Sequence, residues 1–152
     1  MVSHAVAVVE EFRSAENLLG GRAVLGVKPR SRLDWIEVIR RGIPARAVES
    51  LQEKVKLSQV ELARILGIPE RTLARRKREG VLTAEESAKL LRLARVFGRA
   101  DEVFEDADAA LDWLRSSNAS LAGKTPLGLL DTEIGSEAVL DILGRIEHGV
   151  FG

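Results

Sequence analysis

The 152-residue sequence contains no cysteine and only two histidines. The absence of cysteine excludes disulfide bonds and thiolate chemistry, whether nucleophilic or metal-binding. The two histidines, His4 and His148, stand near opposite ends of the chain without companions at ligand spacing, which argues against a zinc site. No paired carboxylates, no nucleophile with a matching base and no phosphate-binding glycine motif are recognisable. We therefore expect no cofactor, no metal and no enzymatic activity.

Long hydrophobic runs are also missing. The longest apolar run near the N-terminus, Ala5–Val9, is far too short to span a membrane or to act as an export signal. The apolar fraction of 45% is ordinary for a globular protein, and the length suffices for one sizeable domain or two small ones. We expect a cytoplasmic protein with no membrane partner.

The chain is neutral as a whole, but its positive and negative charges are divided unequally along it, and residues 101–152 are poor in positive charge. Residues 1–100 contain 20 Lys or Arg against 12 Asp or Glu, whereas residues 101–152 contain 3 against 11. A split of this size predicts that the two parts meet different partners, the alternative being an ordinary drift of charge along a chain. The basic part suits nucleic acid, which would repel the acidic part.

The stretch Leu57–Gly80 has the pattern of a helix-turn-helix unit. Ser58 and Glu61 have the spacing of a capping box, which marks the start of the first helix. Ala63 is small enough to let two helices approach closely, and Gly67 suits the left-handed turn that ends the first helix. Two short helices joined in this way present the second one to a DNA groove.

The predicted second helix carries five Lys or Arg residues, so it suits contact with DNA phosphates, and arginine and threonine also read base edges. The candidate DNA-binding residues are Ser58, Gln59, Arg71, Thr72, Arg75, Arg76, Lys77 and Arg78. A basic face that is merely solvated is the alternative interpretation. One position departs from the usual pattern, because Arg76 follows the anchor Leu73 by three residues, where such motifs bury an apolar side chain. Either Val81 and Leu82 cover the gap, or the helix docks unusually.

The rest of the chain also has helical periodicity, and no segment alternates as a strand does. Helices are expected at residues 3–19, 31–41, 44–55, 84–97, 106–115 and 137–148, with a continuation or restart at 101–104 and a short helix after Thr125-Pro126. This pattern predicts an all-α fold, in which an N-terminal helical bundle with the helix-turn-helix precedes a small C-terminal helical domain. The expected divisions are residues 1–30 (helix and connector), 31–100 (DNA-binding domain) and 101–152 (C-terminal domain).

Three details of these helices are specific enough to test. Leu33, Ile36 and Ile39 are expected to face inward from their helix. Asn118 is expected to end the helix before it in the left-handed conformation. Gly135-Ser136 is expected to break and recap the chain before the last helix.

The C-terminal end of the sequence is apolar. Either Phe151 folds back onto its own core, or the last helix and the tail form a face for another protein. Asp141 and Arg145 are four residues apart and are expected to pair along that helix, whose last turn His148 suits as a cation. The candidate protein-binding residues are Asp141, Arg145, Glu147, His148, Gly149, Val150 and Phe151.

Motifs in the C-terminal part carry a resemblance to a known family. They are Leu121-x-Gly123-x-x-Pro126, Leu129-Leu130-Asp131-Thr132-Glu133-x-Gly135 and Leu143-Gly144-Arg145-Ile146-Glu147-x-Gly149. With them, Trp113–Phe151 closely resembles the toxin-binding domain of Xre-type antitoxins, shared with MbcA and ParS-type proteins. Upstream, Arg71–Lys77 and Glu86-Ser87 are similar to the antitoxins of RES–Xre toxin–antitoxin pairs. The resemblance covers roughly Gly20–Gly152, with Ser117 where relatives often have proline.

This resemblance implies an antitoxin that binds and silences a RES-domain toxin, an enzyme that destroys NAD⁺. Residues 101–152 would be the toxin-binding domain and would cover the entrance to the toxin's active site. The N-terminal part is expected to bind operator DNA of the shared operon as a homodimer within a larger toxin–antitoxin complex, because two-fold symmetric proteins normally read operator half-sites. The helix at 84–97 and the acidic part are the candidate dimer surface. The alternatives are a repressor without a toxin partner, and a sequestering module whose helix-turn-helix no longer binds DNA.

Overall fold

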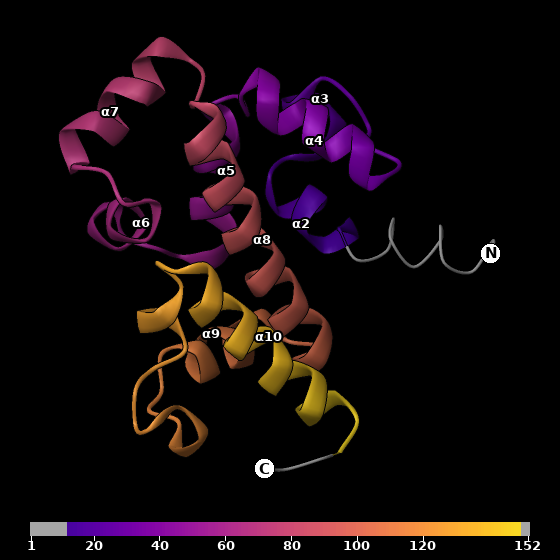
Figure 1. The fold of residues 1–152 in the computed structure, drawn as a ribbon, viewed down its shortest axis with the longest axis vertical. Helices are drawn as coiled ribbons and strands as arrows, with labels where there is room; N and C mark the ends of the chain where they lie inside the picture. The colour runs from indigo at the N-terminus through magenta and orange to yellow at the C-terminus, as the bar shows by residue number, and fades with distance from the viewer. Residues whose placement is uncertain (1–11, 150–152) are drawn as a thin grey trace.

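The computed structural model describes residues 12–149, and every regular element in that range is a helix (Figure 1). In chain order the elements are α2 (Arg13–Leu18), α3 (Gly21–Leu25), α4 (Arg32–Arg41), α5 (Arg46–Val55), α6 (Gln59–Leu66), α7 (Glu70–Glu79), α8 (Ala84–Phe104), α9 (Ala107–Leu114), the short 3-10 helices η1 (Ala119–Leu121) and η2 (Leu127–Leu129), and α10 (Glu133–Glu147). Within the described range, extended backbone pairs at one isolated bridge, between Pro44 and Val81. The expected all-α fold is confirmed.

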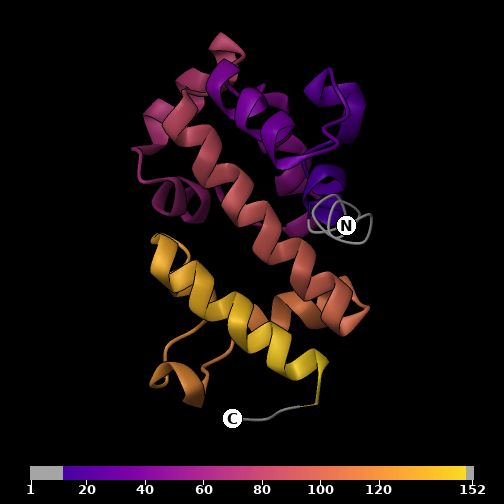
Figure 2. The same ribbon diagram turned by 45° about the vertical axis from the view of Figure 1, so that its right-hand side comes forward.

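The long helix α8 packs against helices from both ends of the chain (Figure 1 and Figure 2). α2, α4 and α6 contact it from the N-terminal part, and α9 and α10 contact it from the C-terminal part. The helix begins at a capping box formed by Thr83 and Glu86, and the left-handed residue Glu105 ends it. α8 therefore continues past residue 100, where the sequence predicts a domain boundary.

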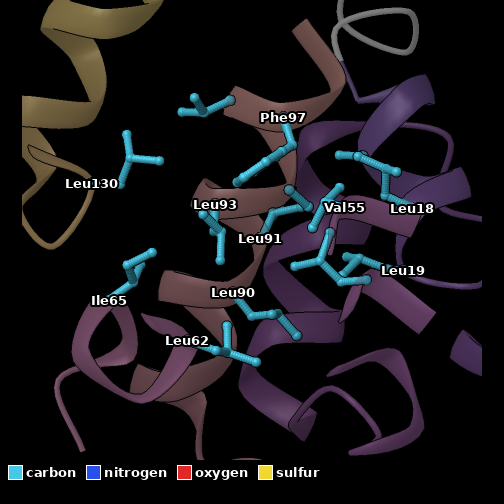
Figure 3. Close-up of a cluster of buried hydrophobic side chains, with 14 of the residues drawn as sticks. Leu18, Leu19, Val55, Leu62, Ile65, Leu90, Leu91, Leu93, Phe97 and Leu130 are labelled. Atoms are coloured by element: carbon cyan, nitrogen blue, oxygen red, sulfur yellow. The ribbon is translucent and has the colours of Figure 1, made fainter. Parts of the chain in front are cut away.

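One apolar core surrounds α8 and extends into both parts of the chain. Leu90, Leu93 and Phe97 of α8 are at most 2% exposed. They belong to the same buried cluster as Leu62 of α6 and Leu130, which precedes α10 (Figure 3). Burying one large aliphatic side chain contributes about 1.5–3 kcal/mol. This shared core, more than any single polar contact, holds the two parts together.

The helix-turn-helix consists of α6 and α7, as the sequence predicts. Both halves of the capping box are present, because the Glu61 backbone N–H donates to the Ser58 hydroxyl and the Ser58 N–H donates to the Glu61 carboxylate, each at 3.0 Å. Ala63 is buried, and Gly67 ends α6 in the left-handed conformation with φ 70°. The extended residue Pro69 then starts α7 as its N-cap.

The expected inward face of α4 is wrong for Leu33 and Ile36, whereas Ile39 is partly buried and packs against the core. Trp35 and Val38 are buried, whereas Leu33 is 74% exposed and Ile36 is 39% exposed. Trp35 packs against Phe12 of the N-terminal segment, with 5.5 Å between the ring centroids. Because an indole buries more apolar area than a leucine, α4 turns this face toward the core and leaves the other apolar face outside.

Two other local predictions are also wrong. Asn118 is extended, with φ −128°, and its side chain accepts from Ser120 N as the cap of η1; the left-handed residue is Ala122. Gly135 lies inside the first turn of α10 and donates its N–H to the cap Thr132, so the helix starts before it rather than after it. A Cβ at Gly135 would overlap the Leu129 carbonyl oxygen, so glycine here permits a close approach of backbone and does not mark a break.

The helix expected at residues 3–19 falls mostly outside the described residues. Its described part is α2, and the glycines that follow start a second short helix, α3, where a plain connector is expected.

Candidate functional site

The outer face of α7 is strongly basic. Arg71 and Arg78 are exposed, and neither side chain has a hydrogen-bond or ion-pair partner among the described residues. The Arg75 side chain is 53% exposed, and its closest carboxylate is Glu79, 3.9 Å away. These three guanidinium groups are accessible to an anionic partner such as the DNA backbone.

The start of α6 adds polar groups beside this face. Lys77 of α7 donates to the side-chain oxygens of Gln52, at 2.8 Å, and of Gln59, at 3.0 Å. The structure thus brings Gln59 and Lys77 together, but uses the ammonium group for contacts within the protein. Ser58 is exposed and its hydroxyl serves as the cap of α6. Thr72 is half-buried.

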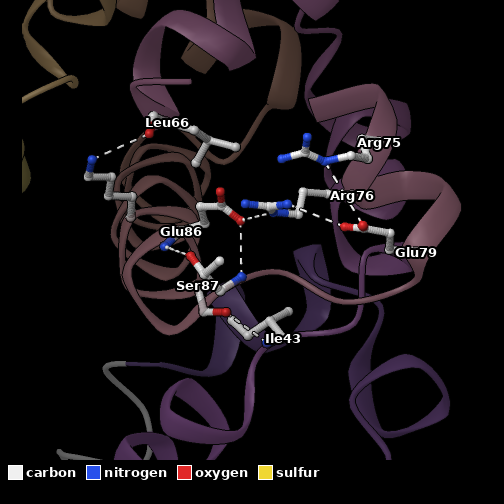
Figure 4. Close-up of polar contacts among 9 residues, drawn as sticks. Ile43, Leu66, Arg75, Arg76, Glu79, Glu86 and Ser87 are labelled. Atoms are coloured by element: carbon white, nitrogen blue, oxygen red, sulfur yellow. Dashed lines mark hydrogen bonds and ion pairs between the residues drawn. The ribbon is translucent and has the colours of Figure 1, made fainter. Parts of the chain in front are cut away.

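Arg76 points away from the accessible face, toward the start of α8 (Figure 4). Its side chain is only 17% exposed, and its Nε donates to Glu86 Oε1 at 2.7 Å. A second contact runs from Nη1 to Glu79 at 3.3 Å. The Arg76 side chain, expected to contact DNA, is thus engaged within the protein: it occupies the position where the motif usually buries an apolar residue, and a buried carboxylate compensates its charge. Of the two residues expected to cover the gap, Leu82 is buried and Val81 is 45% exposed.

Glu86 is almost fully buried, yet it remains ionised. Burial alone would raise the pKa of its carboxyl group, but the hydrogen bonds from Arg76 and from the Thr83 backbone outweigh burial and hold that pKa below the ordinary value. Neighbouring Ser87 is also buried, and its hydroxyl accepts from the Ile43 backbone N–H at 2.8 Å. Two short stretches that carry the family resemblance, around Arg76 and around Glu86, thus meet in space.

The last turn of α10 carries the candidate protein-binding residues. Asp141, Arg145, His148 and Gly149 are exposed, and the expected ion pair between Asp141 and Arg145 is not formed in the described structure. Val150 and Phe151 lie outside the described residues.

Glu147 has an internal role at the same end of α10. Its carboxylate binds the Arg99 guanidinium of α8 through both oxygens, with 2.9 Å between Arg99 Nη1 and Glu147 Oε2. The hydrogen bond from Arg99 lowers the pKa of Glu147. This pair fixes the end of α10 against α8, so the neighbouring exposed residues are presented from a fixed position.

Three arginines that the sequence analysis does not single out connect the N-terminal part of the protein to its C-terminal part. Arg115 of the acidic part forms an ion pair with Glu61 of α6, and Arg64 of α6 donates to the Leu127 carbonyl oxygen at 3.2 Å. Arg99 makes the contact to α10. One feature of the sequence could have pointed to Arg115: it is one of only three Lys or Arg in residues 101–152, so a contact of its own to the basic part is a reasonable expectation.

An open groove of mixed character lies beside α4. Its volume is about 550 Å³, and its lining combines apolar side chains such as Trp35 and Ile36 with four charged ones, Arg32, Arg92, Arg95 and Glu133. Exposed Leu33 and Ile134 add to the uncovered apolar surface of the protein. Within residues 12–149, no helix is long and apolar enough to cross a membrane, and no three His, Asp or Glu side chains are grouped to hold a metal.

Two family descriptions match the chain, one for each part. Residues 34–95 match the antitoxin Xre-like helix-turn-helix domain, and residues 99–149 match the antitoxin Xre/MbcA/ParS C-terminal toxin-binding domain. The matches meet within α8, between the basic surface and the C-terminal surface.

Individual proteins match over most of their length. An Antitoxin Xre of Yersinia enterocolitica is 35% identical over 118 residues, which cover 76% of this chain and 80% of the relative. An Antitoxin Xre of Pseudomonas putida is 36% identical over 112 residues, 73% of this chain and 69% of the relative. One chain of the crystal structure of the M. tuberculosis MbcT–MbcA toxin–antitoxin complex superposes with a TM-score of 0.56 at 26% identity, over 71% of this chain and 96% of that chain.

Proposed function

This chain belongs to the family of Xre antitoxins, and on that premise we propose that it neutralises a RES-domain toxin that degrades NAD⁺ and represses its own operon. A helix-turn-helix domain and a C-terminal toxin-binding domain make it an antitoxin of a toxin–antitoxin system. The identity of the toxin and the binding of operator DNA are the proposed parts.

The proposed DNA contact rests on the outer face of α7. Arg71, Arg75 and Arg78 are accessible there, on the second helix of the motif, which is the helix that enters a groove in such domains. Thr72 and the start of α6 at Ser58 complete the proposed surface. Arg76 and Lys77 are engaged within the protein and support it from behind.

The proposed toxin contact rests on the end of α10. Arg145 and His148 are exposed beside a helix end that the Arg99–Glu147 pair holds in place. The acidic charge of residues 101–152 complements a toxin whose substrate pocket attracts the anionic pyrophosphate of NAD⁺. We propose that this end, with Val150 and Phe151, covers the entrance to the toxin's active site.

We also propose a homodimer within the toxin–antitoxin complex, because operator half-sites are normally read by two-fold symmetric proteins. The helix expected to form the dimer surface, at residues 84–97, is largely buried inside the monomer. The exposed apolar residues Leu33 and Ile36 of α4 are a better-supported surface. Operator DNA and an NAD⁺-degrading enzyme both belong in the cytoplasm, where we place the antitoxin; we propose no catalysis and no cofactor for it.

Co-expression with the protein encoded beside this chain tests the proposal. A RES-domain neighbour expressed alone should deplete cellular NAD⁺ and stop growth, and this chain should restore both and copurify with it. The complex should retard a DNA fragment from upstream of the operon. NAD⁺ loss that this chain does not prevent would overturn the toxin assignment. Operator binding without any complex would then favour a repressor, and a complex without operator binding would favour a sequestering module.

A further inference from the structure

The recognition helix α7 has one fully buried anchor, Leu73. A single apolar contact is non-directional, so Leu73 alone does not set how far α7 is rotated about its own axis. Arg76 lies on the same side of the helix, three residues later, and makes directional contacts with α8. Lys77, on the same side of the helix, donates to Gln52 of α5 and Gln59 of α6. The rotation of α7 therefore depends on what holds these two residues, and Arg76 supplies the contact to α8.

Glu86 can hold Arg76 in place because its own carboxylate is held by the backbone at the start of α8. The same Oε1 atom accepts from Arg76 Nε at 2.7 Å and from the Thr83 backbone N–H at 3.0 Å. The Thr83 hydroxyl in turn accepts from Glu86 N at 3.1 Å, which closes the capping box of the central helix. The next residue, Ser87, ties the start of α8 to the Ile43 backbone. Figure 4 shows these contacts converging between α7 and α8.

The geometry of a helix explains why this matters for the basic face. At about 100° per residue, Arg71, Arg75 and Arg78 fall within an arc of about 60°. On the same scale Leu73 and Arg76 lie about 200° and 140° from Arg71, on the opposite side. Turning the anchored side therefore moves all three accessible guanidinium groups together.

We propose that Arg76 and Glu86 are positioning residues for DNA binding: their buried ion pair sets the rotation of α7 and so the direction of the basic face, without touching DNA. This inference rests on the proposed DNA-binding function of α7. In this role Arg76 acts from inside the protein, whereas a phosphate-contacting arginine touches DNA. Both roles predict that removing the Arg76 side chain weakens operator binding.

The salt dependence of DNA binding separates the two roles. A residue that neutralises a phosphate contributes about 0.9 to the slope of log K against log salt concentration, because its contact releases counterions. Arg76→Met and Glu86→Gln should each weaken operator binding, on the order of tenfold at every salt concentration, with the slope unchanged. The matched control Arg78→Met, on the accessible face of the same helix, should lower the slope. Binding of the toxin should be unaffected in all three variants.

A double substitution and a DNA-free measurement complete the test. Replacing both partners by neutral residues, in Arg76→Met with Glu86→Gln, should recover most of the affinity, because neither charge is then left buried alone and glutamine still caps α8. Amide hydrogen exchange of residues 70–79 in free protein should accelerate in the single variants and return toward the wild-type rate in the double variant. A lower slope for Arg76→Met, together with unchanged binding and exchange for Glu86→Gln, would overturn the proposal. If the wild-type chain binds no operator at any salt concentration, the proposed DNA-binding function fails. Separately, unchanged amide exchange of residues 70–79 in both single variants would overturn the positioning role, whatever the DNA-binding result.

Discussion

Arg115, the residue that ends α9, binds both carboxylate oxygens of Glu61 in the first turn of α6. Its Nη1 lies 2.6 Å from Oε2 of Glu61, and its Nη2 lies 3.0 Å from Oε1. The same Nη2 also donates to the Lys56 carbonyl oxygen at 3.2 Å. An arginine of the acidic part thus contacts the beginning of the helix-turn-helix, so a directional contact joins the two parts in addition to the shared core.

Replacing Arg115 by methionine should lower the free energy of unfolding by about 1 kcal/mol, near the upper end for a partly exposed ion pair. Urea denaturation at pH 7 measures this change. Arg78→Met is the matched control, because the described structure gives that side chain no partner, and it should change the free energy by less than about 0.5 kcal/mol. Equal effects of the two substitutions would show that the Arg115–Glu61 contact adds no stability.

Acid should destabilise the protein through its paired carboxylates. The hydrogen bond from Arg115 lowers the pKa of Glu61 from its ordinary value of 4.5, and the pKa of Glu86 is also lowered. A carboxylate whose pKa is lower in the folded state stabilises that state above its ordinary pKa, and this stability is lost as the pH falls through the lowered value. Asp101 acts in the opposite direction, because burial raises its pKa.

Unfolding free energies measured between pH 7 and pH 3 should therefore decrease toward low pH. Glu61→Gln removes one of the groups responsible, so its curve should be lower at pH 7 and flatter below pH 5. A variant curve parallel to that of the wild type over the whole range would exclude Glu61 as a source of the acid sensitivity.

The accessible arginines of α7 should act as phosphate contacts. Arg71→Met and Arg75→Met should each weaken operator binding and reduce the slope of log K against log salt concentration by about 0.9. Fluorescence anisotropy at several salt concentrations measures both quantities. Arg22→Met, at an exposed position of α3, is the control for the loss of one positive charge elsewhere. Slopes that match the control would remove Arg71 and Arg75 from the interface.

Removal of residues 148–152 should relieve inhibition of the toxin and leave operator binding intact. The cut is placed after Glu147, because that carboxylate holds the end of α10 to Arg99. Growth and cellular NAD⁺ during co-expression measure inhibition, and operator affinity reports the integrity of the other part. A shortened chain that still protects cells would show that the tail does not block the toxin.

The uncovered face of α4 should mediate self-association. Leu33→Asp combined with Ile36→Asp should shift the mass in solution from dimer to monomer, because a charge on each residue prevents the burial of that face. Sedimentation velocity measures the mass. Val60→Asp is the control, since Val60 is an exposed apolar residue on α6, 60% accessible. A dimer that persists in the double variant would place the interface elsewhere.

The sequence by itself determined much of the local structure of this protein, although not the left-handed residue after α9 or the start of α10. Capping boxes at Ser58 and Thr83, the left-handed turn at Gly67 and helical periodicity throughout depend on contacts within four residues of one another, so their pattern is readable along the chain. The opposed charges of the two parts and the specific motifs of the toxin-binding domain are likewise properties of the chain alone.

Only the tertiary structure decided which side chains are accessible. Trp35 rather than Leu33 faces the core because α8 packs against α4 and the Phe12 ring packs against the Trp35 indole. Arg76 has the same chemistry as its accessible neighbours, and only the approach of Glu86 turns it from a surface cation into an internal contact. Local sequence sets helix boundaries through short-range hydrogen bonds, whereas burial and ion pairing join residues that are distant in the chain and adjacent only after packing.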